Sequence, residues 1–501
     1  MRAGDMAEAN YFIKSDYKSR DEPIYYDNRP SAVSDIIHQP EAYLFAAHLA
    51  AKYGADAIID IGCGSARKLM GIAGVRRIGV DFGVNIDFCR EKYPEETWLC
   101  ADLETCSALD LDESIIRRSI IICADVIEHM GDPRNLLKLL AQLNRVALAT
   151  IITTPERDLV RGRNDLGPPA NPAHVREWNL KELSSLLTAY DLPPAFIGLT
   201  VNNNINLEKK TIIAVADRRI GLKSSIPPRD FRPLAIVASF NDSEIITEVV
   251  DKLLNDDIDV HVLDNWSDDG TYEIVEALSR IYSGLSIERF PDDRAKGFNW
   301  AATLDEKARI AAQHPGRWII HHDSDEIRET PWIDISLRAG LWIADQCECN
   351  AVDFTVLDFR PTDSRFVAGC ELEQTLTMFE FGRRPGHFVQ AKVWKQDREM
   401  IPLSQSGGHD AQFPNRKVFP YKFILKHYPI RSPDHARKKI FRERRGRYSP
   451  ELKARGWHTQ YDRYSPEDNF LWETEDLIPF DDIDVRRDYL LELISGVGIV
   501  R

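Results

Sequence analysis

The sequence predicts two consecutive α/β domains, each built on a largely parallel sheet. Three observations lead to this prediction. The chain has 501 residues, whereas single hydrophobic cores stop growing near roughly 250–300 residues. Short apolar runs alternate with amphipathic stretches in both halves, which is typical of sheets covered by helices on both faces. A polar, proline-containing segment at 217–233 separates the two patterns.

The first half begins with a helix expected over 42–53, ended by Gly54. Apolar runs then predict strands at 57–61, 77–80, 97–100, 120–123 and 146–153, with helices at 135–143 and 180–190. Two further strands, 195–201 and 211–215, are separated by a polar segment and predict a closing antiparallel hairpin. We expect a first domain at 1–217, with its core at 33–217, and a linker at 218–232.

The second half repeats the alternation with a new sheet. We expect strands at 234–240, 260–263, 285–289 and 317–321, with helices at 244–254, 272–282 and 300–313. These elements predict a second domain at 233–430. The charged remainder, 431–501, predicts a helical C-terminal extension.

Composition excludes several classes of protein. A net charge of −15 argues against a general nucleic-acid binder, which needs a basic face. No apolar run reaches the roughly 18 residues of a membrane-spanning helix, and the first 20 residues lack the apolar core of a signal peptide. We expect a cytoplasmic protein, with oligomeric state left open.

A glycine turn after the first strand predicts a nucleoside-binding site. Asp60 precedes Gly62 and Gly64, whose missing Cβ atoms allow a ligand close to the backbone. Asp81 ends the next strand, where a carboxylate can accept hydrogen bonds from a ribose. Asp102 follows the third strand, within reach of an adenine, and Asp125 follows the fourth. A dinucleotide site needs a small residue where this chain has Arg67, which disfavours NAD.

This order of motifs resembles the class I S-adenosylmethionine-dependent methyltransferases. The resemblance implies a Rossmann-like sheet in which Gly62 and Gly64 contact the methionine part of the cofactor, Asp81 the ribose and Asp102 the adenine. The segments 154–157 and 171–178 are similar to those of members that methylate small molecules, including sugars. A hydroxyl acceptor benefits from a base, and His129 and His174 are the candidates; each is alternatively a structural residue of its loop.

Three strands of the second half each end in carboxylates. Asp242 follows the first strand, Asp268 the second, and Asp323 and Asp325 the fourth. Residues two apart on an extended strand can face the same side, and paired carboxylates suit Mg²⁺ or Mn²⁺ beside a diphosphate.

Together these segments resemble the GT-A glycosyltransferases of family 2. The resemblance implies that Asp242 and Asp268 contact the nucleoside of a nucleotide sugar, and that Asp323 and Asp325 hold the metal and the ribose-phosphate. It also implies a late metal-binding histidine, assigned to His427, and a carboxylate base. The glycine-rich segment 406–410 makes Asp410 the base candidate for an inverting transfer, with Glu371 and Glu373 as alternatives.

A basic cluster, Arg437–Arg447, stands out in this acidic chain. We expect it to contact a donor diphosphate, a lipid-linked acceptor or an anionic membrane surface, which would place the protein at the inner face of the membrane; solvated salt bridges are the alternative. The whole predicts one domain that adds a sugar to a glycan or lipid-linked acceptor and another that O-methylates a sugar hydroxyl in bacterial surface polysaccharide synthesis. Rival hypotheses are a single catalytic domain with a scaffold partner, a nucleotide-binding sensor, and an NAD-linked enzyme.

Overall fold

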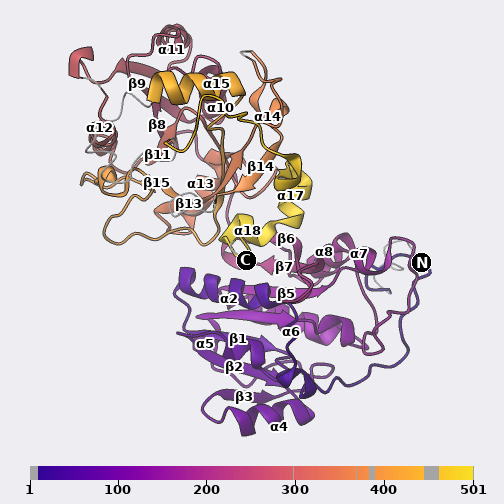
Figure 1. Cartoon of the computed structure of the whole chain (residues 1–501). Coiled ribbons are helices and arrows are strands. Elements are labelled where there is room, and N and C mark those ends of the chain that lie inside the picture. Colours follow the sequence, from indigo (N-terminus) through magenta and orange to yellow (C-terminus); the bar gives the residue numbers. More distant parts are fainter. Residues whose placement is uncertain (1–9, 297, 368, 383–389, 445–461, 500–501) are drawn as a thin grey trace. The chain divides into compact units, whose positions relative to one another are not determined.

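The structure is a computed structural model that describes residues 10–296, 298–367, 369–382, 390–444 and 462–499. The chain forms two compact units (Figure 1). Unit 1 comprises Met1–Lys223 and Asp484–Ile499, and unit 2 comprises Ser224–Ile483. The last segment of the chain therefore belongs to unit 1, whereas the sequence placed it in a separate extension.

Unit 1 is built on a seven-stranded sheet in the order β3-β2-β1-β4-β5-β7-β6. The first five strands are parallel, and β7 runs antiparallel to both of its neighbours, β5 and β6. The strands are β1 (Ala57–Ile61), β2 (Arg76–Asp81), β3 (Thr97–Cys100), β4 (Ser119–Ala124), β5 (Ala149–Pro155), β6 (Phe196–Val201) and β7 (Lys209–Ala216). The predicted sheet and its closing hairpin are confirmed, and the carboxyl ends of the five parallel strands meet at one edge.

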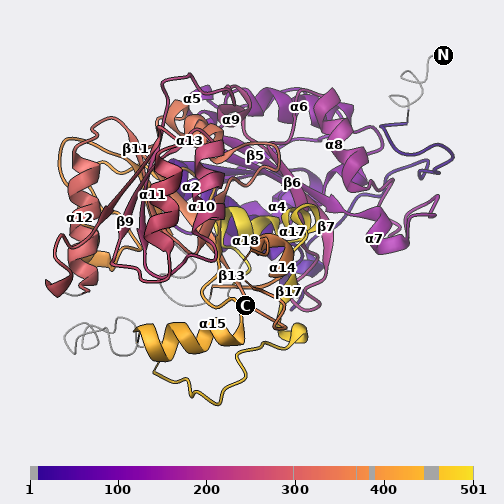
Figure 2. The same cartoon turned by 90° about the horizontal axis from the view of Figure 1, so that it is seen from above.

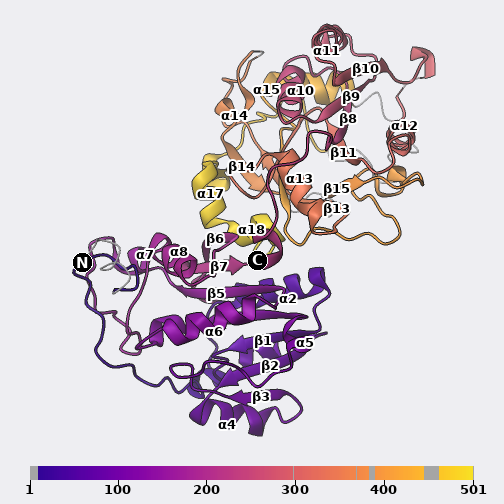
Figure 3. The same ribbon diagram turned by 180° about the vertical axis from the view of Figure 1, so that it is seen from behind.

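Helices cover both faces of this sheet, as the opposite views of Figures 1 and 3 show for α2 and α6. The helix α2 ends at Gly54, which adopts the left-handed conformation that glycine tolerates. Leucines and isoleucines of α6, α8 and the strands form one buried core. The helices are α2 (Pro40–Tyr53), α3 (Arg67–Met70), α4 (Gly83–Lys92), α5 (Glu113–Ile116), α6 (Arg134–Asn144), α7 (Arg157–Arg161), α8 (Leu180–Ala189) and α9 (Arg218–Gly221).

The helix α18 (Leu490–Ser495) explains why the chain returns to unit 1. It packs against β6 and α2, and Lys209 forms an ion pair of 2.5 Å with Glu492, which is almost fully buried. Gly198 of β6 permits the close approach, because a Cβ atom there would lie 2.6 Å from the carbonyl oxygen of Arg487. The apolar residues of α18 thus complete the core of unit 1.

Unit 2 contains a larger mixed sheet whose main path is β10-β9-β8-β11-β15-β13-β14-β17. Strands β8 to β11 are parallel to their neighbours, β15 is antiparallel to β11, and β12 pairs with β16 beside this path. The strands are β8 (Leu234–Ser239), β9 (Asp259–Asp264), β10 (Leu285–Arg289), β11 (Trp318–Asp323), β12 (Glu326–Glu329), β13 (Ala351–Phe359), β14 (Met378–Phe381), β15 (Gln390–Lys395), β16 (Phe423–His427) and β17 (Ile478–Pro479). The α/β class with two separate sheets is confirmed.

The helices of unit 2 connect and flank these strands. The helices α10 and α11 pack against each other and against β9, and Figure 2 shows α15 continuing into one coil with the π-helical turn Lys438–Arg444. The helices are α10 (Ile246–Asn255), α11 (Thr271–Ser279), α12 (Trp300–Ala312), α13 (Leu337–Gln346), α14 (Leu372–Thr375) and α15 (Pro433–Arg437). Most of α17 (Asp482–Asp488) belongs to unit 1, whose last segment begins at Asp484. Among the residues that the structure describes, no helix has the length and apolarity needed to cross a bilayer.

Candidate active sites of the two units

The turn after β1 has the backbone that a close-fitting ligand needs. Gly62 and Gly64 both adopt positive φ angles, +79° and +54°, which residues with a Cβ rarely reach. The carboxyl of Asp60, buried beneath this turn, accepts a hydrogen bond of 3.0 Å from the hydroxyl of Tyr43. Its second oxygen has no partner, and burial raises the pKa of Asp60 to about 7.

Asp81 is joined to the same turn. One oxygen of Asp81 accepts the Gly64 amide at 2.8 Å, and the other accepts the Phe82 amide at 2.7 Å. Each carboxylate oxygen can accept more than one hydrogen bond, so both still have capacity for ribose hydroxyls. Burial raises the pKa of Asp81 above its ordinary value, although the two amides oppose this shift. The glycine turn and Asp81, which the sequence selected separately, are thus joined directly in the structure.

Asp102 and Asp125 lie at the ends of the neighbouring strands. The carboxylate of Asp102 accepts the amide of Glu104 at 3.0 Å, which shapes the loop after β3. Asp125 has a left-handed backbone, with φ of 55°, and its carboxylate accepts a hydrogen bond from the amide of Gln39. The strand order brings both carboxylates to the edge that carries Asp60 and Asp81.

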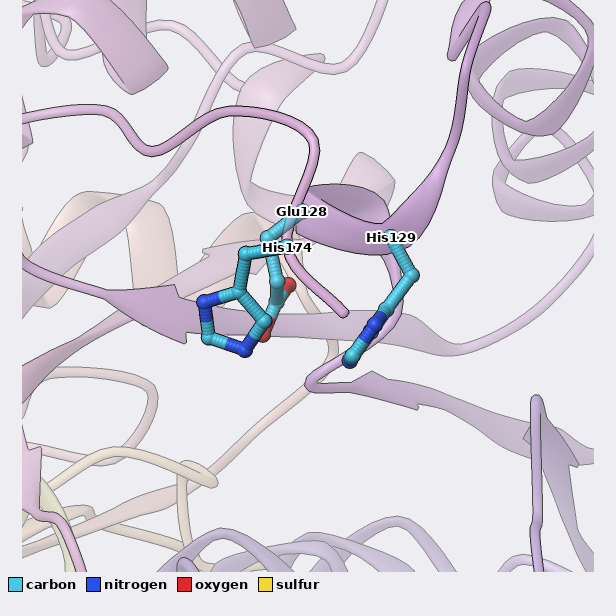
Figure 4. Close-up of side chains that lie close together, drawn as sticks. All are labelled: Glu128, His129 and His174. Atoms are coloured by element: carbon cyan, nitrogen blue, oxygen red, sulfur yellow. The ribbon is translucent and has the colours of Figure 1, made fainter. Parts of the chain in front are cut away.

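His129 and His174 meet beside Glu128 at the end of β4 (Figure 4). Their rings lie 4.9 Å apart between centroids and cross at 89°. Burial lowers the pKa of His129 to about 4, and the neighbouring His174 lowers it further, so His129 is neutral at pH 7. The two residues that the sequence selected separately therefore form one cluster.

The segment before α2 covers this edge, which the sequence did not predict. The Tyr25 hydroxyl donates to the Phe82 carbonyl at 3.0 Å, and the Asn28 amide donates to Asn85 at 2.9 Å. A Cβ atom on Gly64 would lie 2.5 Å from the side-chain nitrogen of Asn28. The polar residues 10–39 show no periodicity, so their sequence gives no signal of this role.

These residues fit S-adenosylmethionine. The cofactor carries an ammonium and a sulfonium, and the unpartnered, buried oxygen of Asp60 is an acceptor for the ammonium. Asp81, which is bonded to the Gly64 amide, offers further acceptor capacity to hydroxyl groups such as those of a ribose.

In unit 2, the carboxyl edge of β8 and β9 joins Asp242 and Asp268. The Asn241 side chain donates to Asp268 at 3.0 Å and accepts its amide at 3.0 Å. The buried Asp242 accepts a hydrogen bond of 2.6 Å from Ser324. It also forms an ion pair of 3.2 Å with Arg431, which is fully buried. Because Ser324 lies between Asp323 and Asp325, its bond to Asp242 joins the ends of β8 and β11, and the Asn241–Asp268 pair joins the ends of β8 and β9.

Asp323 is held by two buried lysines. Its carboxylate lies 3.0 Å from the ammonium of Lys392 and 3.7 Å from that of Lys307. These cations hold the pKa of Asp323 well below its usual value, although burial opposes them. Burial in turn lowers the pKa of Lys307 to about 8. Two ammonium groups so close make Asp323 a poor ligand for a further cation.

Asp325 and His427 do fit a divalent cation. The Nδ1 atom of His427 lies 2.7 Å from an oxygen of Asp358, which leaves its Nε2 atom facing Asp325 at 3.9 Å. A carboxylate behind a histidine is the usual support for a metal-ligating imidazole. Lys439 binds the other oxygen of Asp325 at 2.9 Å, and it lowers the pKa of Asp325 against the opposing effect of burial. Of the three predicted metal ligands, Asp325 and His427 therefore have the better chemistry for a cation, and the metal itself stays a prediction.

Asp410 lies in the loop that pairs with β15 at Ala391. Its oxygens bind Arg416 and, at 2.8 Å, Gln412. The alternatives differ: Glu373 forms ion pairs with two lysines, which lower the pKa of its carboxyl, whereas Glu371 lies at the start of α14. The base of the transfer stays a prediction.

The basic cluster contributes to the site itself. Lys439 contacts Asp325, and Lys438 lies 3.5 Å from Glu443 and 3.9 Å from Asp269. Residues 445–447 of the cluster lie outside the described part of the chain. The sequence indicated a diphosphate contact for this cluster, but no local pattern singled out Lys307 or Lys392.

Comparison with known proteins supports a different family for each unit. Residues 234–334 match the family described as Glycosyl transferase family 2. A probable S-adenosylmethionine-dependent methyltransferase of Mycobacterium tuberculosis (strain CDC 1551 / Oshkosh) is 30% identical over 156 residues, covering 29% of this chain and 54% of that protein. Its counterpart in strain ATCC 25618 / H37Rv matches equally. The chain spans about half the length of the curated relatives it matches.

Solved methyltransferase structures are also similar to this chain. An S-adenosylmethionine-dependent methyltransferase from Clostridium acetobutylicum has a TM-score of 0.28 at 13% identity, over 38% of this chain and 95% of that one. The magnesium protoporphyrin IX methyltransferase of Synechocystis has a TM-score of 0.27 at 14% identity, over 43% of this chain and 95% of that one. The resemblances of the first region to S-adenosylmethionine-dependent methyltransferases and of the second to family 2 glycosyltransferases are confirmed.

Proposed function

We propose that this chain is a bifunctional enzyme. Unit 2 transfers a sugar from a nucleotide sugar to a glycan or lipid-linked acceptor, and unit 1 methylates a sugar hydroxyl with S-adenosylmethionine. The observation that supports the proposal is that one chain carries candidate ligand-binding residues at the carboxyl edges of two sheets. Asp60, Gly64 and Asp81 lie at one edge. Asp242 lies at the other, where it binds Ser324, the residue next to Asp325.

Methyl transfer is a displacement at carbon in which position matters most. The acceptor oxygen attacks the methyl carbon, the carbon–sulfur bond breaks, and its electron pair stays on sulfur. The hydroxyl proton leaves toward the cluster formed by His129 and His174. His129 is neutral at pH 7, so its ring can accept a hydrogen bond from the acceptor.

Glycosyl transfer at unit 2 uses fixed positive charge. When bound, a divalent cation held by Asp325 and His427 supplies a charge that neutralises the donor diphosphate. Lys439 adds a second, permanent charge at the same carboxylate. A deprotonated acceptor hydroxyl attacks the anomeric carbon opposite the diphosphate, which inverts the configuration. Asp410 is our candidate for the base, and Asp242 and Asp268 for the nucleoside contacts.

The substrates suggest the setting. Nucleotide sugars and S-adenosylmethionine are cytoplasmic metabolites, and the basic residues of α15 and its extension suit a lipid-linked diphosphate or an anionic surface. We propose a role in bacterial surface polysaccharide assembly, at the inner face of the membrane.

The test supplies the full-length protein with a panel of nucleotide sugars, Mn²⁺ and saccharide acceptors, and follows release of nucleoside diphosphate. The products are then given S-adenosylmethionine, and mass spectrometry measures a gain of one methyl group. We expect Asp81→Asn to lose only methylation and Asp325→Asn to lose only sugar transfer. If one activity is absent from the wild type while its cofactor still binds, that unit is a scaffold and the bifunctional proposal is wrong.

A further inference from the structure

Glu128, His129 and His174 form a compact group at the carboxyl edge of the sheet in unit 1 (Figure 4). One ligand atom from each residue lies within 4.8 Å of the others. Glu128 and His129 come from the turn after β4, and His174 comes from the segment before α8. Among the described residues, this is the group of three or more such side chains whose spacing suits a metal ion.

Hydrogen bonds fix the same tautomer in both histidines. The Nδ1 atom of His129 lies 2.9 Å from the carbonyl oxygen of Ala173, which can only accept. The Nδ1 atom of His174 lies 2.6 Å from an oxygen of Glu177. Each Nδ1 therefore donates its hydrogen, and each Nε2 carries a lone pair. Metal-ligating histidines are held in this way by an acceptor behind the ring.

The third residue supplies a carboxyl oxygen without a partner. Glu128 is fully buried, and one of its oxygens accepts a hydrogen bond of 2.9 Å from Thr154, whereas the other has no partner. The site thus holds two imidazole lone pairs and one unpartnered carboxyl oxygen, and a buried polar atom of this kind is costly unless it binds something.

We propose that Glu128, His129 and His174 bind a divalent transition-metal ion that presents the acceptor hydroxyl to the methyl donor. Two imidazoles with one carboxylate favour Mn²⁺, Fe²⁺, Co²⁺ or Zn²⁺ over Mg²⁺ and Ca²⁺, which prefer oxygen. The Asn171 amide, 2.9 Å from the Nε2 atom of His174, would give way to the ion.

The ion would also define the class of acceptor. Three protein ligands leave coordination positions open, and two adjacent hydroxyls of a sugar can fill them. A bound ion would lower the pKa of the acceptor hydroxyl. The hydroxyl proton would leave to solvent, and the acceptor oxygen would bond to the methyl carbon as the carbon–sulfur bond breaks and its electron pair stays on sulfur. Under this inference the two histidines are ligands and not bases. It rests on the proposed methyltransferase function of unit 1.

The test titrates chelator-treated, full-length protein with Co²⁺ and follows its visible absorption and the bound cobalt after gel filtration. The background is His427→Gln, which removes the cation ligand of unit 2. We expect one equivalent of cobalt in this background, and a loss of at least tenfold in affinity in Glu128→Gln and in His174→Gln. Glu128→Gln keeps the shape of the side chain, and His48→Gln, a histidine of α2 outside the cluster, should bind as the parent does.

Binding of S-adenosylmethionine is measured by calorimetry in the same proteins. Cobalt binding that is unchanged in both Glu128→Gln and His174→Gln, or absent from the parent while the cofactor binds, overturns the metal site and leaves the methyltransferase standing. Cobalt bound at the cluster without cofactor binding refutes the methyltransferase and not the metal site. Loss of both ligands only in His174→Gln indicates misfolding of that variant, and Glu128→Gln then decides.

Discussion

Asp60 should make cofactor binding depend on pH. Its carboxyl is buried, has one oxygen without a partner, and has a pKa near 7 because of that burial. Near neutral pH, the protein without cofactor therefore carries a proton on Asp60 about half of the time. The cationic ammonium of S-adenosylmethionine binds best to the charged carboxylate, so binding releases that proton. The affinity must then rise with pH up to about 7.

The size of the effect follows from the pKa. A pH of about 5.5 lies about 1.5 units below this pKa, so Asp60 is mostly protonated there, and removing its proton costs about 2 kcal/mol. We expect affinity for S-adenosylmethionine to be roughly 15-fold weaker at pH 5.5 than at pH 7, with about 0.9 proton released per cofactor at pH 6. The raised pKa also affects folding. Because the buried carboxylate is less stable than the buried acid, the free energy of unfolding should fall as the pH rises from about 4 to 7.

Calorimetry in two buffers of different ionisation enthalpy measures both quantities. Asp60→Asn should bind more weakly at pH 7 and lose the pH slope. Tyr43→Phe removes the hydroxyl that stabilises the charged form, so its midpoint should move to higher pH. Asp56→Asn, an exposed carboxylate paired with Arg118, serves as the control. A flat affinity and no proton release in the wild type would refute the reasoning.

Three further results are expected. Lys439→Met should lower sugar-transfer turnover by roughly 100-fold, since it removes a buried charge beside the proposed diphosphate site. Lys438 is half-exposed, so turnover in Lys438→Met should stay within about threefold of the wild type. Comparable losses in both variants would contradict this prediction. Removing the carboxylate behind a ligand, Asp358→Asn, should weaken Mn²⁺ activation 10–100-fold in activity titrations; an unchanged Mn²⁺ dependence would speak against the assignment. Gly64→Ala should abolish measurable cofactor binding by calorimetry, because its backbone and Asn28 leave no room, while Gly221→Ala, in open space, should bind normally.

The sequence predicts those elements whose apolar runs end abruptly. The strands Ala57–Ile61, Thr97–Cys100 and Leu285–Arg289 have the predicted bounds. Each is a short run that begins directly after a polar residue or a glycine, namely Asp56, Glu96 and Gly284. The gathering of candidate site residues at one sheet edge could also be predicted, since the carboxyl ends of parallel strands share an edge; their roles stay predictions. Asp60, Asp81, Asp242 and Asp325 illustrate this.

Partners that come from distant segments could not be predicted. Lys392 lies 69 residues from Asp323, and Lys439 lies 114 residues from Asp325. Nothing in the local sequence distinguishes Lys392 from a surface lysine, and the basic cluster that contains Lys439 did not indicate which carboxylate this lysine would bind. The return of α18 to unit 1 is hidden in the same way, because an apolar helix face does not name the surface that it covers.

Each unit has a candidate metal site whose histidines are hydrogen-bonded through Nδ1, but the two sites differ in their number of histidines. His427 is anchored through Nδ1 by Asp358 and faces one carboxylate, whereas His129 and His174 are anchored through Nδ1 and share one carboxylate. An oxygen-rich site completed by a diphosphate suits Mg²⁺ or Mn²⁺, and a site with two imidazoles suits later transition ions. A single preparation should therefore need two metals, with Mg²⁺ supporting sugar transfer and Co²⁺ or Zn²⁺ supporting methylation. If Mg²⁺ alone restored both activities after chelation, the histidines of unit 1 would not be ligands.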